Sequence, residues 1–156
     1  MRLFLVLCFA ATCSVRLLAV PPGEEGNTSP IVQAEMDRLA APYVAKARAT
    51  YPAAKKRFLA GLPPGYKFVV GFRFSQRDER TGKVAVEDML VQVERIEKGR
   101  IIGRLANAPV LVCNIKYGDS LSRPEREITN WIIEHPDRSE EGNFVGKFLE
   151  KHFERK

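Results

Sequence analysis

The pattern of apolar and polar positions divides the chain into a helical, a strand-rich and a second helical region. Ser29-Pro30 is typical of a helix start, and the apolar residues that follow roughly trace one helical face. Pro42 is expected to kink or split this helix. A second helical run begins near Thr50 and ends at the Gly61–Gly65 segment, which contains two prolines. The sequence therefore predicts N-terminal helices within residues 30–61.

Residues 66–133 have the pattern of short strands joined by turns. From Tyr66 to Phe74, apolar and aromatic residues occupy every second position, which indicates a half-buried strand. A charged loop (residues 76–83) leads to a second strand from Val84, and the two strands are expected to pair as an antiparallel hairpin. Further apolar runs predict strands at residues 100–105, 110–115 and 128–133.

The second strand contains an apparent change of phase. Val84 and Val86 share one face of a regular strand, whereas Met89, Val91 and Val93 fall on the other. A one-residue bulge at Glu87-Asp88 would bring all five apolar residues to the core side. Because bulges often re-aim side chains beside functional sites, these two carboxylates are candidate functional groups. The plainer alternative is that they lie at a solvated rim.

Helical spacing returns after Gly142-Asn143 and predicts a C-terminal helix over residues 143–154. The fold class we expect is α+β: a small, strongly bent antiparallel sheet of about five strands, in the form of an SH3-like partial barrel, with N-terminal helices and a C-terminal helix. Residues 30–156 would form this single domain. The first strand's aromatic residues (Phe68, Phe72 and Phe74) and Trp131 should supply much of the core.

Residues 1–20 have the layout of a secretory signal peptide. Arg2 precedes an apolar stretch, and the small residue Ala19 comes just before Val20-Pro21-Pro22. The apolar stretch falls short of the ~20 residues that a membrane span needs. We therefore expect cleavage, a polar linker over residues 21–29 and a secreted or periplasmic protein. A retained anchor is the alternative.

Composition and charge change this picture only slightly. The whole chain of 156 residues carries a formal charge of +6, which falls to +4 if Arg2 and Arg16 leave with the signal peptide. Cleavage would also leave Cys113 as the one remaining cysteine, so no intramolecular disulfide is expected. The apolar neighbours of Cys113 favour a buried, inert thiol.

No motif for a cofactor, a metal or nucleophilic catalysis is evident. His135 and His152 lie in no local Ser/His/Asp or Cys/His context, and no Cys or His pair has metal-ligand spacing. Basic residues cluster on the N-terminal helices and again near the C-terminus, and such a surface could meet an anionic membrane, a cell-wall polymer or nucleic acid. Glu150 and Glu154 are interleaved with the C-terminal cluster, which favours ordinary solvation of a helix face. Export argues against a nucleic-acid partner.

Several segments together resemble the YegJ-like family, small bacterial proteins that carry a domain of unknown function. The resemblance covers roughly residues 68–153 and is carried by the segments 86–91, 103–109, 116–119, 128–131 and 142–144. The family pattern has an aromatic or imidazole ring after the glutamate and a tryptophan two positions later, whereas this chain has Asp88 and Leu90. The resemblance implies a small strand-rich domain in secreted or envelope-associated proteins, and the family brings no assigned activity.

The function we expect is that of an exported, monomeric, non-enzymatic binding or accessory module of the cell envelope, with an unidentified envelope or protein ligand. The hypothetical binding residues are Glu87, Asp88, Asn107 and Asp119, which the second strand and two turns could bring into one polar patch. The alternative is a hydrolase-type enzyme that uses Glu87 or Asp88. A third interpretation is an envelope-surface protein held by its basic helices.

Overall fold

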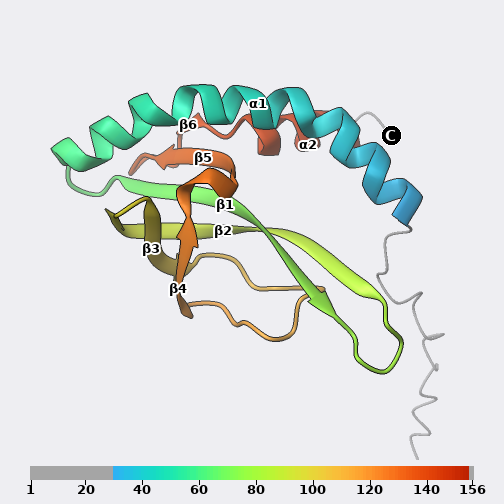
Figure 1. The fold of residues 1–156 in the computed structure, drawn as a ribbon. Helices are drawn as coiled ribbons and strands as arrows, with labels where there is room; N and C mark the ends of the chain where they lie inside the picture. The colour runs from blue at the N-terminus through green and yellow to red at the C-terminus, as the bar shows by residue number, and fades with distance from the viewer. Residues whose placement is uncertain (1–29, 155–156) are drawn as a thin grey trace, which may run out of the picture.

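A computed structural model describes residues 30–154 of the chain. Six antiparallel strands form one sheet in the order β4-β3-β2-β1-β5-β6. The sheet is curved and does not close on itself, so the expected α+β fold with a bent antiparallel sheet is confirmed (Figure 1). In chain order the elements are α1 (Pro30–Ala60), β1 (Lys67–Arg77), β2 (Val84–Glu97), β3 (Arg100–Leu105), β4 (Ser120–Pro124), the 3-10 turn η1 (Glu125–Glu127), β5 (Ile128–Glu134), β6 (Glu140–Gly142) and α2 (Phe144–Phe153).

The N-terminal region is one helix rather than the two that the prolines suggested. Helix α1 runs without interruption through Pro42 and Pro52 and arches over the sheet (Figure 1). Both proline residues are exposed, so the carbonyl groups that lose a backbone hydrogen bond can be hydrated instead. Packing of the opposite helix face against β5 and α2 holds the continuous helix together.

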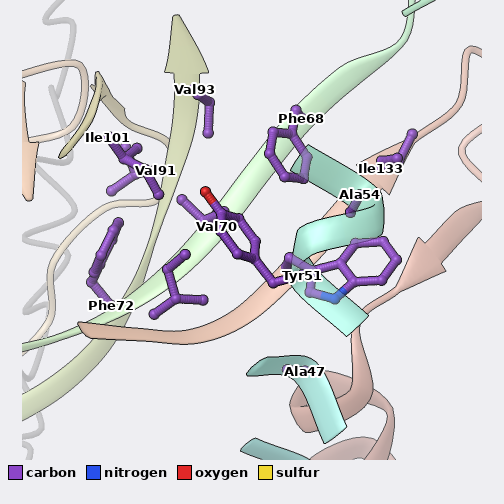
Figure 2. Packing of buried hydrophobic residues seen from close by; sticks show 12 residues of the cluster. Ala47, Tyr51, Ala54, Phe68, Val70, Phe72, Val91, Val93, Ile101 and Ile133 are labelled. Carbon is purple, nitrogen blue, oxygen red and sulfur yellow. The ribbon is translucent and has the colours of Figure 1, made fainter. Parts of the chain in front are cut away.

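The main core lies between α1 and the centre of the sheet, as the close-up in Figure 2 shows. Phe68 of β1 is almost fully buried and lies beside the aromatic rings of Tyr51 and Phe58 from α1, with ring centroids 6.3 Å and 5.2 Å away. Trp131 of β5 is also buried, as expected, and its indole N–H donates to Thr50 Oγ1 at 2.9 Å. Packing of this kind provides most of the stability of a small domain.

Strand β2 is regular at the place where a bulge was predicted. Its pairing with β1 continues without a shift through Phe74↔Glu87 and Arg73↔Asp88, so the bulge prediction is wrong. Glu87 therefore shares a face with Met89, which is fully buried. The irregular positions are elsewhere, between Val93 and Arg95 of β2 and between Gly71 and Phe72 of β1.

The predicted strand at residues 110–115 is not formed. Residues 106–119 instead cross the sheet as a loop, and in this segment only Val112 is fully buried. Cys113 is exposed, so the prediction of a buried thiol is also wrong. Strands β4 and β6 are short and largely polar, and neither was predicted.

The C-terminal helix begins as expected after Gly142-Asn143. Both residues have a positive φ, and a Cβ added to Gly142 would lie 2.4 Å from the carbonyl oxygen of Trp131. Only glycine allows this close approach, which turns the chain from β6 into α2. Among the described residues, no helix is long and apolar enough to cross a membrane. The predicted signal peptide and linker lie outside the described residues.

Candidate functional site

The carboxylate of Glu87 holds the 106–119 loop in place. Its two oxygens accept hydrogen bonds from three successive backbone N–H groups, those of Val110 (3.0 Å), Leu111 (2.9 Å) and Val112 (3.2 Å). Successive backbone N–H groups that converge in this way form an anion-binding concavity, and here the anion is a side chain of the same domain. The side chain reaches these groups because Glu87 points to the face of β2 that the loop covers.

Two other predicted site residues also bind backbone groups around this loop. Asn107 Oδ1 accepts the backbone N–H of Leu90 in β2 at 2.7 Å and so ties the start of the loop to the sheet. Asp119 Oδ2 accepts the backbone N–H of Lys116 at 2.9 Å and closes a turn at the end of the loop. Glu87, Asn107 and Asp119 thus fix the middle, the start and the end of the same loop.

Asp88 has a different position and a different partner. It lies opposite Arg73 of β1, and its Oδ2 is 2.8 Å from Nη2 of that guanidinium. Asp37 of α1 binds the same guanidinium at 2.7 Å and 2.8 Å. The hydrogen bonds from Arg73 lower the pKa of Asp37, and the two carboxylates raise the pKa of Arg73.

An open cleft of about 540 Å³ lies between the loop and the adjoining strands. Its lining is Arg73, Phe74, Ser75, Val112, Asn114, Ile115, Asp119, Ser120 and Arg123. Arg123 of β4 lies over the ring of Phe74 with its guanidinium carbon 5.0 Å from the centroid, and it donates to the carbonyl oxygen of Arg73 at 3.1 Å. Two guanidinium groups and one carboxylate therefore line the cleft. Both arginines are ion-paired, Arg73 with Asp37 and Asp88 and Arg123 with Glu127 at 2.8 Å, so the lining is polar without a free positive charge.

The four predicted residues are thus divided among three places. Asp119 lines the cleft, whereas Asp88 lines a neighbouring hollow on the other side of Arg73 and Arg123. Glu87 and Asn107 line neither of these spaces. Instead, they form the hydrogen bonds that hold the loop against β2. Among residues 30–154, no three His, Cys, Asp or Glu side chains come close enough together to hold a metal ion.

Sequence reasoning missed the two arginines and Gln76. Arg73 occupies an ordinary outward position in an alternating strand, and Arg123 lies in a polar stretch without periodicity. Gln76 Oε1 accepts the backbone N–H groups of Cys113 (2.6 Å) and Asn114 (3.1 Å), so β1 also holds the loop. No local motif marks any of the three residues, because each acts on a segment at least 37 residues away or in another strand.

These features define a class of protein: a small α+β domain in which the sheet and one ordered loop form an open, arginine-lined cleft. The chain belongs to a family described as an uncharacterized protein conserved in bacteria (DUF2314), whose model matches residues 40–156. This match agrees with the expected resemblance to a bacterial domain of unknown function. Neither the curated proteins nor the solved structures include a significant match to the chain.

Proposed function

We propose that this protein is a non-enzymatic binding or accessory module of the bacterial cell envelope. The apolar segment at residues 1–20 supports export, and the shape of the described domain supports binding. The binding surface in this proposal is the cleft between the 106–119 loop, β1 and β4. Asp119 contacts the ligand directly, while Glu87 and Asn107 keep the loop in its binding conformation.

The observation that carries the proposal is the set of hydrogen bonds that the Glu87 carboxylate accepts from the loop. A partly buried carboxylate that accepts three backbone N–H groups provides strong, directional bonds for a loop that has few buried side chains of its own. The loop is therefore held in one conformation, and a pre-organised binding surface lowers the entropic cost of binding a ligand.

The same contacts make the alternative of a hydrolase less favourable. A general base needs a carboxylate oxygen within reach of a substrate or water proton. Both oxygens of Glu87 already face N–H donors, and Asp88 is paired with Arg73.

The ligand in this proposal is a polar fragment of the cell wall, because polar side chains and two ion-paired arginines line the cleft. A titration with muramyl dipeptide, a soluble cell-wall fragment, tests this by NMR. Saturable shifts are expected at the backbone amides of Ser75, Asn114 and Ser120. The amide of Lys151 on α2 serves as the control. Shifts confined to α1 and α2 would show that the cleft is not this binding site.

Export needs a separate experiment. N-terminal sequencing of protein purified from the native host should give a mature chain that begins between Val20 and Pro22. An intact Met1 on protein from the soluble cytoplasmic fraction would contradict export and leave the cleft hypothesis to be judged on the titration alone.

A further inference from the structure

A second concave surface lies between the two helices. Helices α1 and α2 pack side by side, and a groove of about 690 Å³ runs along their junction. We define the helix groove by its lining residues: Tyr43, Lys46, Phe144, Lys147, Phe148, Lys151 and His152. It shares no residue with the cleft beside the 106–119 loop.

The charge of the helix groove has one sign. Three lysines line it and no carboxylate does. Several other basic residues of the domain are paired with acids, for example Lys55 with Glu125 and Arg57 with Glu141. By contrast, Lys46 lies over the ring of Phe144 at 4.8 Å, and Lys147 donates only to neutral backbone carbonyl groups. The positive charge here is therefore not neutralised within the groove.

Aromatic rings line the helix groove, and one more lies next to it at the end of α2. Tyr43 and Phe148 stack with ring centroids 4.5 Å apart, and His152 lies 5.6 Å from Phe148. At the end of α2, Phe153 is 58% exposed and meets the edge of His152. Exposed aromatic rings beside long basic side chains are typical of the boundary between lipid headgroups and acyl chains.

We propose that the helix groove binds the surface of a membrane that contains anionic phospholipid. Lys46, Lys147 and Lys151 contact the phosphate groups, and the rings of Tyr43 and Phe153 enter the headgroup layer. Nucleic acid fits less well, because bases stack on ring faces. Tyr43 and Phe148 already cover one face of each other, and Lys46 covers a face of Phe144. This inference is independent of the ligand proposed for the cleft.

The test is sedimentation of the full chain with vesicles of phosphatidylglycerol and phosphatidylcholine in equal parts, compared with pure phosphatidylcholine. The expected result is stronger binding to the anionic vesicles that weakens as salt is raised. Residues 1–20 are the same in every variant, so differences between variants report the described domain. Equal binding to both kinds of vesicle would overturn the proposal.

Charge variants locate the contact. Lys151→Gln should lower the partition coefficient about fivefold, and Lys46→Gln with Lys151→Gln should lower it roughly twentyfold. The matched control is Lys83→Gln with Lys116→Gln, which removes the same charge from exposed loop positions away from the helices. An equal loss in the control would show attraction by net charge alone, with no role for the groove. Release of the wild-type protein by stoichiometric single-stranded DNA would assign the groove to nucleic acid instead. Both results would overturn the proposal.

Discussion

The two halves of the sheet are covered in different ways. Over the central strands, α1 covers apolar side chains, and Phe68, Val70 and Ile133 are almost fully buried beneath it. Beyond Met89, the same face of β2 is covered by the 106–119 loop, and the central contact is the carboxylate of Glu87 with three backbone N–H groups. Apolar packing fixes one half, and charge-assisted hydrogen bonds fix the other.

This difference has a consequence for stability and function. Apolar packing is non-directional and contributes most of the free energy of folding. Hydrogen bonds to a charged group contribute less free energy but define one geometry for the loop that receives them. We therefore expect the helix-covered half to determine whether the domain folds, and the loop-covered half to determine the shape of the cleft.

The largest effect should follow from Trp131→Ala in the helix-covered half. Removal of this buried ring is expected to lower the free energy of unfolding by ~3–5 kcal/mol, because it leaves a cavity and removes the bond to Thr50. Chemical denaturation followed by circular dichroism measures the change. Phe153→Ala is the control, and this exposed ring should change stability by no more than ~0.5 kcal/mol. Equal losses in both variants would refute the proposed division of the sheet.

Glu87→Gln should have the second largest effect, confined to the loop-covered half. The amide keeps the size of the side chain, but it loses the charge and turns an N–H₂ group toward backbone donors. The expected loss is about 1–3 kcal/mol, since the partly buried N–H groups of Leu111 and Val112 lose an acceptor. Hydrogen exchange at Leu111 and Val112 should accelerate, while exchange at Val70 should change less. Glu79→Gln, in the exposed β1–β2 loop, is the matched control. Unchanged exchange at Leu111 and Val112 would show that Glu87 does not hold the loop.

The same comparison explains what could be predicted from sequence. The alternation from Tyr66 to Phe74 is a local signal, and strands β1, β2, β3 and β5 follow from such signals. The prediction of a bulge at Glu87-Asp88 was wrong. Glu87 occupies a core-facing position of a regular strand, and a charged residue there interrupts the alternation of apolar residues just as a bulge would. Its partners, the N–H groups of residues 110–112, lie more than 20 residues away and cannot be read locally.

The prediction of two N-terminal helices was wrong for a related reason. Pro42 and Pro52 are local helix-breaking signals, but the stabilising contacts of α1 come from β5 and α2 at the other end of the chain. Asn107 and Asp119, which were expected in two turns, bind backbone groups at the start and the end of the loop. The arginines that line the cleft were not predicted, because a single arginine in a strand has no distinguishing pattern.

A smaller effect is expected from pH at Glu141 of β6. Hydrogen bonds from Arg57, and then the contact with His135 Nε2 at 2.9 Å, lower the pKa of Glu141 to about 2 from an ordinary value of 4.5. A depressed carboxylate pKa stabilises the folded state above pH 4.5, and this stabilisation disappears as the pH falls through about 2. More than a third of the Glu141 side chain is exposed, so the gain is at most ~1 kcal/mol.

Denaturation of wild type and Glu141→Gln across this pH range measures the contribution. The stability difference between them should be largest above pH 4.5 and should vanish near pH 2. Arg57→Gln should remove most of the same pH-dependent part, because Arg57 is the main cause of the shift. A difference that grows as the pH falls would contradict the assignment.

The smallest effect concerns the thiol of Cys113 and sharpens the description of the loop. Only the backbone N–H of Cys113 is tied to the sheet, through Gln76 at 2.6 Å, and the residue itself is exposed. A bulky thiol reagent should therefore react at similar rates with folded and denatured protein, and without loss of stability. The matched control is Val112→Cys in a Cys113→Ser background, because position 112 is 2% exposed and belongs to the same loop. That thiol should react much more slowly in the folded state. Slow reaction at both positions would mean that the loop packs its side chains against the sheet as the helix-covered half does, and that backbone hydrogen bonds alone do not define it.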